Sequence, residues 1–145
     1  MTGEKDVDEV SGAIVDCAYH IHKDLGPGLL ESVYEAVLAK RLERLGFVVE
    51  RQKPIRFEFD GLEFEEGFRV DLLVDHKVVV ELKSVERMSR VYPKQLLTYL
   101  KLMNLHVGLL INFGAATLKE GLERVVNNHV PSATSPLRVS RKDLH

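Results

Sequence analysis

The sequence predicts a fold of the α/β class. Its central β-sheet is expected to be mixed, as in α+β proteins, and to be flanked by helices. In the first third of the chain, apolar residues recur at three- and four-residue steps, as in amphipathic helices. From Phe47 onward the period changes to two, as in strands with one buried face. Residues 106–113, HVGLLINF, form a continuous apolar run typical of a strand buried on both faces, which requires helices on both sides of the sheet.

The length of 145 residues is suited to one domain with an ordinary core. We assign residues 1–127 to this domain and residues 128–145, rich in proline, serine and charge, to an extended or mobile tail. The single cysteine, Cys17, excludes an internal disulfide and fits a reducing compartment. The sequence has no secretory signal and no apolar run near the ~18 residues of a membrane span, so we expect a cytoplasmic protein.

The net charge of −2 gives no overall signature of a tight nucleic-acid binder. The charges are unevenly distributed, however. Residues 82–101 contain five cations and one anion, whereas residues 57–68 contain five anions. Two interpretations of residues 82–101 stay open: a basic surface beside the central strands, or the solvated face of a helix.

Two helices are predicted in the N-terminal part of the chain. The first covers about residues 6–24 and ends at Gly26-Pro27-Gly28. The second covers about residues 29–45 and ends at Gly46. On the second helix the inner side is expected to carry Leu30, Val33, Tyr34, Val37, Leu38, Leu42 and Leu45, and the outer side Glu35, Lys40, Arg41 and Arg44.

Strands and further helical segments follow. Phe57 and Phe59 alternate with polar residues, so we expect them to lie on the buried face of a strand. Asp60-Gly61 predicts a hairpin turn. A helix is predicted to begin near Pro93, and residues 118–126 fit either a short helix or a strand.

The segment 69–84, RVDLLVDHKVVVELKS, places charged residues among aliphatic ones. An unpaired charge in such strands costs about 2 kcal/mol or more, so Asp71, Glu81 and Lys83 require compensation. A divalent metal ion is the simplest candidate, because hard cations bind carboxylate oxygens. The alternative is a solvated cross-strand ion-pair face formed by Glu81 and Lys83, with Asp71 as a charge that protects a strand edge.

The metal hypothesis sets a condition on the turn between these two strands. Glu81 and Lys83 are two residues apart and therefore share a face of the sheet. A two-residue turn would pair Asp71 with Val80 and point its carboxylate to the opposite face. An odd-length turn, such as Asp75-His76-Lys77, or a β-bulge is therefore required.

Glu31, near the start of the second helix, also has two interpretations. An acid in the first helical turn stabilises the helix dipole by roughly 0.3–1 kcal/mol, which gives Glu31 a purely structural role. In the other interpretation the helix crosses the sheet and Glu31 lies close to the central carboxylates. The residues alone leave this choice open.

Several short motifs occur in a fixed order along the chain. They are Gly28-Leu29-Leu30-Glu31-Ser32-Val33-Tyr34, Asp71 followed after nine residues by Glu81-Leu82-Lys83, Gln95-Leu96-Leu97-Thr98-Tyr99-Leu100, Ile111-Asn112-Phe113-Gly114, and Gly121 with Arg124-Val125-Val126-Asn127. From about residue 10 to 127, this order resembles the PD-(D/E)xK nuclease superfamily. The first motif is similar to the one that names the GxxExxY group within it. Val70 departs from the pattern, because the superfamily's name places a proline there.

The resemblance implies a restriction-endonuclease-like core in which Asp71 and Glu81 hold Mg²⁺ or Mn²⁺. It implies that Lys83 orients or polarises the attacking water or the scissile phosphate. It further implies that Glu31 is an additional metal or water ligand and that Gln95 lines the catalytic site.

We therefore expect a metal-dependent nuclease, a hydrolase that acts on the phosphodiester bonds of DNA or RNA. The alternative is a noncatalytic module of the same fold that binds nucleic acid or a protein partner. No membrane partner is expected. A homodimer is expected, because a domain of this size has little surface for gripping a duplex alone.

Overall fold

The computed structural model describes residues 4–128. The predicted C-terminal tail therefore lies, except for Asn128, outside the described residues. The elements follow the order α1 (Val7–Leu25), α2 (Glu31–Arg44), β1 (Val49–Phe59), β2 (Leu62–Val74), β3 (Val78–Lys83), α3 (Val91–Met103), β4 (Val107–Asn112), α4 (Leu118–Gly121) and β5 (Leu122–Val126).

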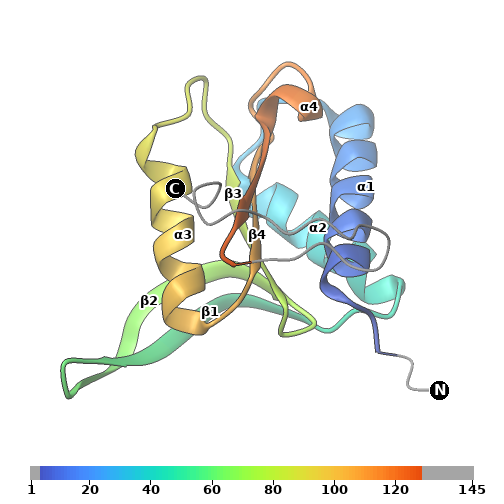
Figure 1. The fold of residues 1–145 in the computed structure, drawn as a ribbon. Coiled ribbons are helices and arrows are strands. Elements are labelled where there is room, and N and C mark those ends of the chain that lie inside the picture. The colour runs from blue at the N-terminus through green and yellow to red at the C-terminus, as the bar shows by residue number, and fades with distance from the viewer. Residues whose placement is uncertain (1–3, 129–145) are drawn as a thin grey trace.

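The strands form one mixed sheet in the order β1-β2-β3-β4-β5. Neighbouring strands are antiparallel except for β3 and β4, which are parallel and are joined through α3. Helices α1 and α2 lie on one side of the sheet and α3 on the other (Figure 1). This arrangement confirms the predicted α/β fold class and is consistent with a restriction-endonuclease-like core.

Each face of the sheet is buried in its own apolar core. Alternate residues of β3 enter the two cores, with Val78 and Val80 packed in the cluster that contains α1 and α2 and Val79 in the cluster that contains α3. The predicted strand at 106–113 is confirmed as β4, and all six of its residues are buried. The continuous apolar runs of β3 and β4 follow from this burial on both faces.

The inner face of α2 differs from the one expected. Leu30, Val33 and Leu45 are 75%, 39% and 59% exposed, whereas Glu35 is buried. The helix begins at Glu31, so that Leu30 is its N-cap and Leu45 its C-cap. The buried stripe consists of Tyr34, Glu35, Leu38, Ala39 and Leu42. The expectation was wrong because a polar partner from the sheet draws an acidic side chain inward.

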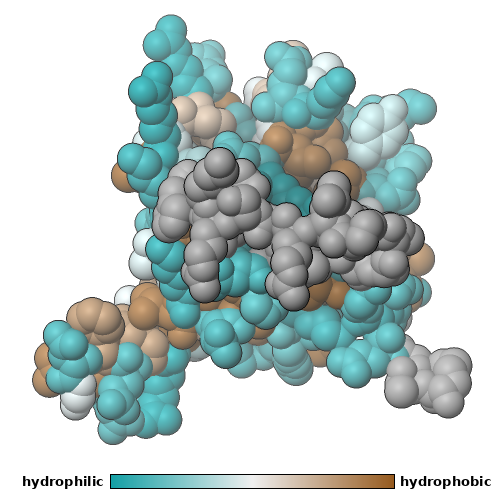
Figure 2. All heavy atoms as spheres, viewed as in Figure 1, coloured by the Kyte–Doolittle hydropathy of each residue, from teal (hydrophilic) through white to brown (hydrophobic). Residues whose placement is uncertain are grey.

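The predicted turn at Asp60-Gly61 is confirmed by positive φ angles of 54° and 77°, and it joins β1 to β2. This hairpin projects from the body of the protein (Figure 1). Phe59, expected on a buried face, is 61% exposed and neighbours the equally exposed Leu62. The alternating pattern predicted the strand correctly, but no second layer covers its far end. Figure 2 shows apolar and polar side chains mixed over the projecting hairpin.

The ambiguous segment 118–126 contains both predicted structures, α4 followed by β5. Among residues 4–128, no helix combines the length and the apolar character needed to cross a lipid bilayer.

Candidate functional site

The β2–β3 hairpin meets the condition that the metal hypothesis set. Leu72 pairs with Val80 and Val74 with Val78, so that three residues, Asp75 to Lys77, form the turn. Continuing this register by one residue places Asp71 opposite Glu81. The two carboxylates therefore lie on the same face, as the odd-length turn requires.

Asp71 and Glu81 are joined by reciprocal hydrogen bonds to the opposite strand. The backbone N–H of Asp71 donates to Glu81 Oε2 at 2.8 Å, and the backbone N–H of Leu82 donates to Asp71 Oδ2 at 2.8 Å. The regular ladder between β2 and β3 ends one residue earlier, at the pair of Leu72 and Val80. Side-chain carboxylates thus replace backbone carbonyls as acceptors at the point where the ladder stops.

The electrostatic environment of Glu81 is unfavourable for its charge. Burial raises the pKa of Glu81 to about 8, and the neighbouring charges of Asp71 and, more weakly, Glu31 act in the same direction. The hydrogen bond from the Asp71 backbone and the charge of Lys83 oppose this shift. A bound cation would reduce the repulsion among these carboxylates and favour the ionised form of Glu81.

Lys83 lies on the α3 side of the sheet. Its Nζ sits 4.3 Å from the centroid of the Tyr92 ring, in the first turn of α3. The half-buried side chain is therefore held by a cation–π contact, which is worth about 0.5–2 kcal/mol. Its ammonium also lowers the pKa of Glu81. The contact with Tyr92 fixes a positive charge beside the carboxylates.

Glu31 is the first residue of α2 and is exposed. Its position depends on Tyr34, whose hydroxyl donates to Gly26 O at 2.5 Å and accepts the N–H of Leu29 at 3.2 Å. The buried Tyr34 ring stacks on Phe113 with centroids 4.3 Å apart. The tyrosine therefore ties the loop before α2 to the end of β4 and sets where Glu31 stands.

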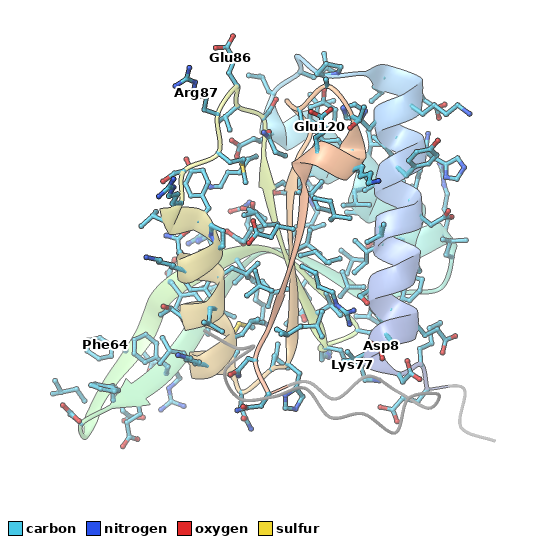
Figure 3. All side chains as sticks on the ribbon, turned by 45° about the horizontal axis from the view of Figure 1, so that its top comes forward. Asp8, Phe64, Lys77, Glu86, Arg87 and Glu120 are labelled. Atoms are coloured by element: carbon cyan, nitrogen blue, oxygen red, sulfur yellow. The ribbon has the colours of Figure 1, made fainter. Side chains whose placement is uncertain are left out.

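A cleft of about 660 Å³ opens beside Glu31. Its walls are the loop before α2, the segment Ser84 to Glu86 and Gly114. The side chain of Asn112 holds the second wall, because its amide exchanges hydrogen bonds with the backbone N–H and C=O of Val85 at 3.0 and 2.9 Å. Figure 3 shows Glu86 pointing outward from this loop, next to Arg87. The lining of the cleft includes Glu31 and Ser84, the residue after Lys83, but not Lys83 or the two carboxylates.

Gln95 and Tyr99 share a face of α3 but differ in their surroundings. Burial and the charges of Glu81 and Asp71 raise the pKa of Tyr99, which places its phenol near the carboxylates. Gln95 lies on α3 with an exposed side chain. The structure therefore brings together Asp71, Glu81 and Lys83 and places Glu31 close enough to affect the pKa of Glu81.

Two further polar residues beside the carboxylates, Glu35 and Gln52, were not predicted from the sequence. Gln52 Nε2 donates to Asp71 Oδ1 at 3.1 Å and to Glu35 Oε1 at 2.6 Å, while Arg51 Nε donates to Glu35 Oε2 at 3.1 Å. Nothing in the helical periodicity marks Glu35, since it falls beside the expected apolar stripe. The one available signal was its position four residues after Glu31, which puts both acids on one side of the helix.

The donor set fits a small, hard divalent ion. Within residues 4–128, no three His, Cys, Asp or Glu side chains form a compact metal-binding group. Asp71 and Glu81 provide two adjacent carboxylates, with oxygens that retain free lone pairs. Mg²⁺ is commonly held by one or two carboxylates, with water and substrate phosphate at its other positions. Such an ion would compensate the charge that Glu81 carries when ionised.

The chain is similar to one known protein family. A sequence model of the PD-(D/E)XK nuclease superfamily matches residues 8–125, which include Glu31, Asp71, Glu81 and Lys83. PD-(D/E)XK nucleases typically use divalent metal ions. No curated protein and no solved structure matches the chain significantly. Because the matched segment covers most of its length, the chain belongs to the PD-(D/E)XK nuclease superfamily.

Proposed function

We propose that this protein is a metal-dependent nuclease that hydrolyses phosphodiester bonds of DNA or RNA. The observation that carries the proposal is the pair of carboxylates, Asp71 and Glu81, linked across the open end of the β2–β3 ladder. They would hold Mg²⁺ or Mn²⁺, with Glu31 binding a water molecule of the ion, because Glu31 does not form a compact three-residue group with the two carboxylates. Such an ion makes a nucleophile available near neutral pH and neutralises charge on the phosphate.

The chain's own residues have separate tasks in this proposal. Asp71 and Glu81 would hold the ion through carboxylates that are fixed by backbone N–H groups of the opposite strand. Lys83, held against the Tyr92 ring, offers a compact positive charge to a phosphate oxygen or to the attacking water. The cleft beside Glu31 has the size of a small-ligand site and would take the nucleic-acid strand. Gln95 would contact that strand from the exposed face of α3.

We further assign the chain to the GxxExxY group of the superfamily. Each named position of that motif has a task here that supports the assignment. Gly28 has a φ of 110°, a backbone conformation that favours glycine. Glu31 begins α2, and Tyr34 closes the loop before it.

The proposal includes a cytoplasmic homodimer built from one domain per chain, residues 1–127. The buried Cys17 fits a reducing compartment. Exposed Phe59 and Leu62 at the tip of the β1–β2 hairpin favour association between two copies. Light scattering of the wild type and of a Phe59→Ser, Leu62→Ser double variant tests this point. A wild-type monomer would refute the dimer.

Activity is tested by incubating the purified protein with single- and double-stranded DNA and RNA, with Mg²⁺, Mn²⁺ or EDTA. We expect cleavage that needs the divalent ion and is lost in Glu81→Gln and Asp71→Asn, which preserve size while removing charge. Glu123→Gln is the matched control, because Glu123 is an exposed acid on β5. Cleavage that survives in both site variants would contradict the proposal.

A second measurement separates a nuclease from a noncatalytic binding module. Salt-dependent retention of nucleic acid without cleavage, in any of the ionic conditions, would favour the binding module. If the protein neither retains nucleic acid nor binds Mn²⁺ in calorimetry, both functions are overturned. That result would point to an assembly role.

A further inference from the structure

A row of three polar side chains crosses the sheet at the carboxylate pair. The register of β1 and β2 pairs Arg51 with Leu72 and Lys53 with Val70, so Gln52 stands opposite Asp71. The register of β2 and β3 places Asp71 opposite Glu81. Gln52, Asp71 and Glu81 therefore stand side by side on three adjacent strands.

The backbone of β1 is irregular where this row begins. Gln52 has a φ of 48°, in the left-handed region that residues other than glycine rarely adopt, at a cost of about 1–3 kcal/mol. Consecutive residues of a regular strand point to opposite faces. Here Arg51 and Gln52 both reach the carboxylate of Glu35, because the left-handed residue interrupts the pleat.

The chemistry of the contacts fixes the orientation of the Gln52 amide. Its nitrogen lies between Asp71 Oδ1, at 3.1 Å, and Glu35 Oε1, at 2.6 Å. Both partners are hydrogen-bond acceptors, and only the NH₂ group of an amide can donate to two of them. The side chain thus carries two donors into a space between two carboxylates without adding a further negative charge.

Glu35 anchors this bridge to α2. It is buried, and both of its carboxylate oxygens accept hydrogen bonds from β1, one from Arg51 and one from Gln52. Glu31 stands four residues earlier on the same side of the helix. The Glu35–Gln52–Asp71 connection therefore ties the helix that carries Glu31 to the strand that carries Asp71.

We propose that Gln52 is a positioning residue, which holds the Asp71 carboxylate in place by bridging it to the buried Glu35. This inference rests on the proposed function, in which Asp71 holds a divalent ion. Groups that orient metal-binding carboxylates from outside typically change metal affinity about tenfold to hundredfold when removed. The strained backbone at Gln52 is retained because it allows its amide to reach both acids.

Two substitutions distinguish a role of the Gln52 side chain from a role of its backbone conformation. Gln52→Gly removes the amide and relieves the left-handed φ, so a purely backbone role predicts equal or greater thermal stability and unchanged ion binding. Gln52→Glu keeps the shape but replaces the donors with acceptors. Asn104→Gly is the matched control, because Asn104 is an exposed amide residue with a φ of 56° at the end of α3.

Mn²⁺ binding by calorimetry on the full chain is the first readout. We expect about a tenfold to hundredfold weaker affinity in Gln52→Gly and in Gln52→Glu, and wild-type affinity in Asn104→Gly. Wild-type affinity in Gln52→Gly would overturn the proposal.

The second readout needs no metal ion. The amide proton of Leu82, which donates to Asp71 Oδ2, should exchange with solvent at least several-fold faster in Gln52→Gly than in the wild type. The amide of Leu110, in the neighbouring buried strand β4, serves as the internal reference. If the wild type binds no Mn²⁺, the metal site fails, but this exchange rate still decides whether Gln52 positions Asp71. An unchanged Leu82 rate would refute that role.

Discussion

The Asp71 carboxylate accepts a hydrogen bond of 2.8 Å from the backbone N–H of Leu82, and the Glu81 carboxylate accepts one of 2.8 Å from the backbone N–H of Asp71. Each carboxylate thereby replaces a backbone carbonyl as the acceptor for an N–H group of the opposite strand. The pair thereby satisfies the backbone where the ladder ends, while holding two carboxylates side by side. The charges of these two carboxylates are therefore coupled to the backbone geometry, so protonation of either carboxylate should change the stability of the fold.

The stability of the metal-free protein should fall with rising pH because of Glu81. Its pKa is raised from 4.5 to about 8, mainly by burial and by the charge of Asp71. The folded state therefore binds more protons than the unfolded state between these values. The stabilisation is fully present below about pH 4.5 and is lost as the pH rises through about 8, with a slope of at most about 1.4 kcal/mol per pH unit.

Urea unfolding in EDTA from pH 5 to pH 8.5 measures this slope, and Glu81→Gln should flatten it. Because Mg²⁺ competes with the proton for the carboxylate, the rise in melting temperature on adding Mg²⁺ should grow over the same pH range. An equal slope in the wild type and in Glu81→Gln would assign the pH dependence to other groups.

The contact between Lys83 and Tyr92 should contribute to turnover. Removing the lysine charge in Lys83→Met should lower the cleavage rate about a hundredfold or more, since one charge that stabilises a transition state is commonly worth that much. Tyr92→Leu should lower it only about twofold to thirtyfold, matching a cation–π contact of about 0.5–2 kcal/mol. Single-turnover cleavage rates provide the comparison.

Tyr92→Phe is the control for this prediction, because it keeps the ring and should retain the wild-type rate. Lys119→Met, which removes an exposed lysine on α4, should also be neutral. A Tyr92→Phe variant as slow as Tyr92→Leu would show that the hydroxyl, and not the ring, matters.

Tyr34→Phe should destabilise the protein by about 1–3 kcal/mol, because it leaves Gly26 O and the N–H of Leu29 without their side-chain partner. The loop before α2 should loosen, and Glu31 with it, so cleavage should slow by more than the loss of folded protein explains. Chemical unfolding and cleavage rates on the same samples test both effects. Tyr19→Phe, at a side chain that is 51% exposed, should change neither.

Two glycine substitutions should act in opposite directions. In Gly114→Ala the new Cβ would lie 2.5 Å from Val85 O and 2.6 Å from Val85 N, so the wall of the cleft must shift and stability should fall. In Gly12→Ala, within α1, the new Cβ has no heavy atom within 4 Å, and stability should rise by up to about 1 kcal/mol. Melting temperatures measured by calorimetry decide between these signs, and a destabilised Gly12→Ala would contradict the second.

The sequence by itself determined the order and type of the main elements, because period and turn chemistry are local properties. For Asp71 and Glu81 it set only a condition, that they share a face if the turn between their strands has odd length. The three-residue turn of the structure meets that condition. The choice between the two interpretations of Glu31 could not be made locally. Only the packing of α2 against the sheet decided that Glu31 stands near enough to act on Glu81.

Tertiary structure alone decided the roles of Glu35 and Gln52. Glu35 was expected on the outer side of α2, because it lies outside the predicted apolar stripe and because a carboxylate is costly to bury without partners. Its partners, Arg51 and Gln52, lie on a strand whose register and left-handed residue no local pattern encodes. The exposure of the end of the β1–β2 hairpin could not be predicted from the sequence for a related reason. Alternation predicts which face of a strand is apolar, whereas burial depends on whether another layer covers that face.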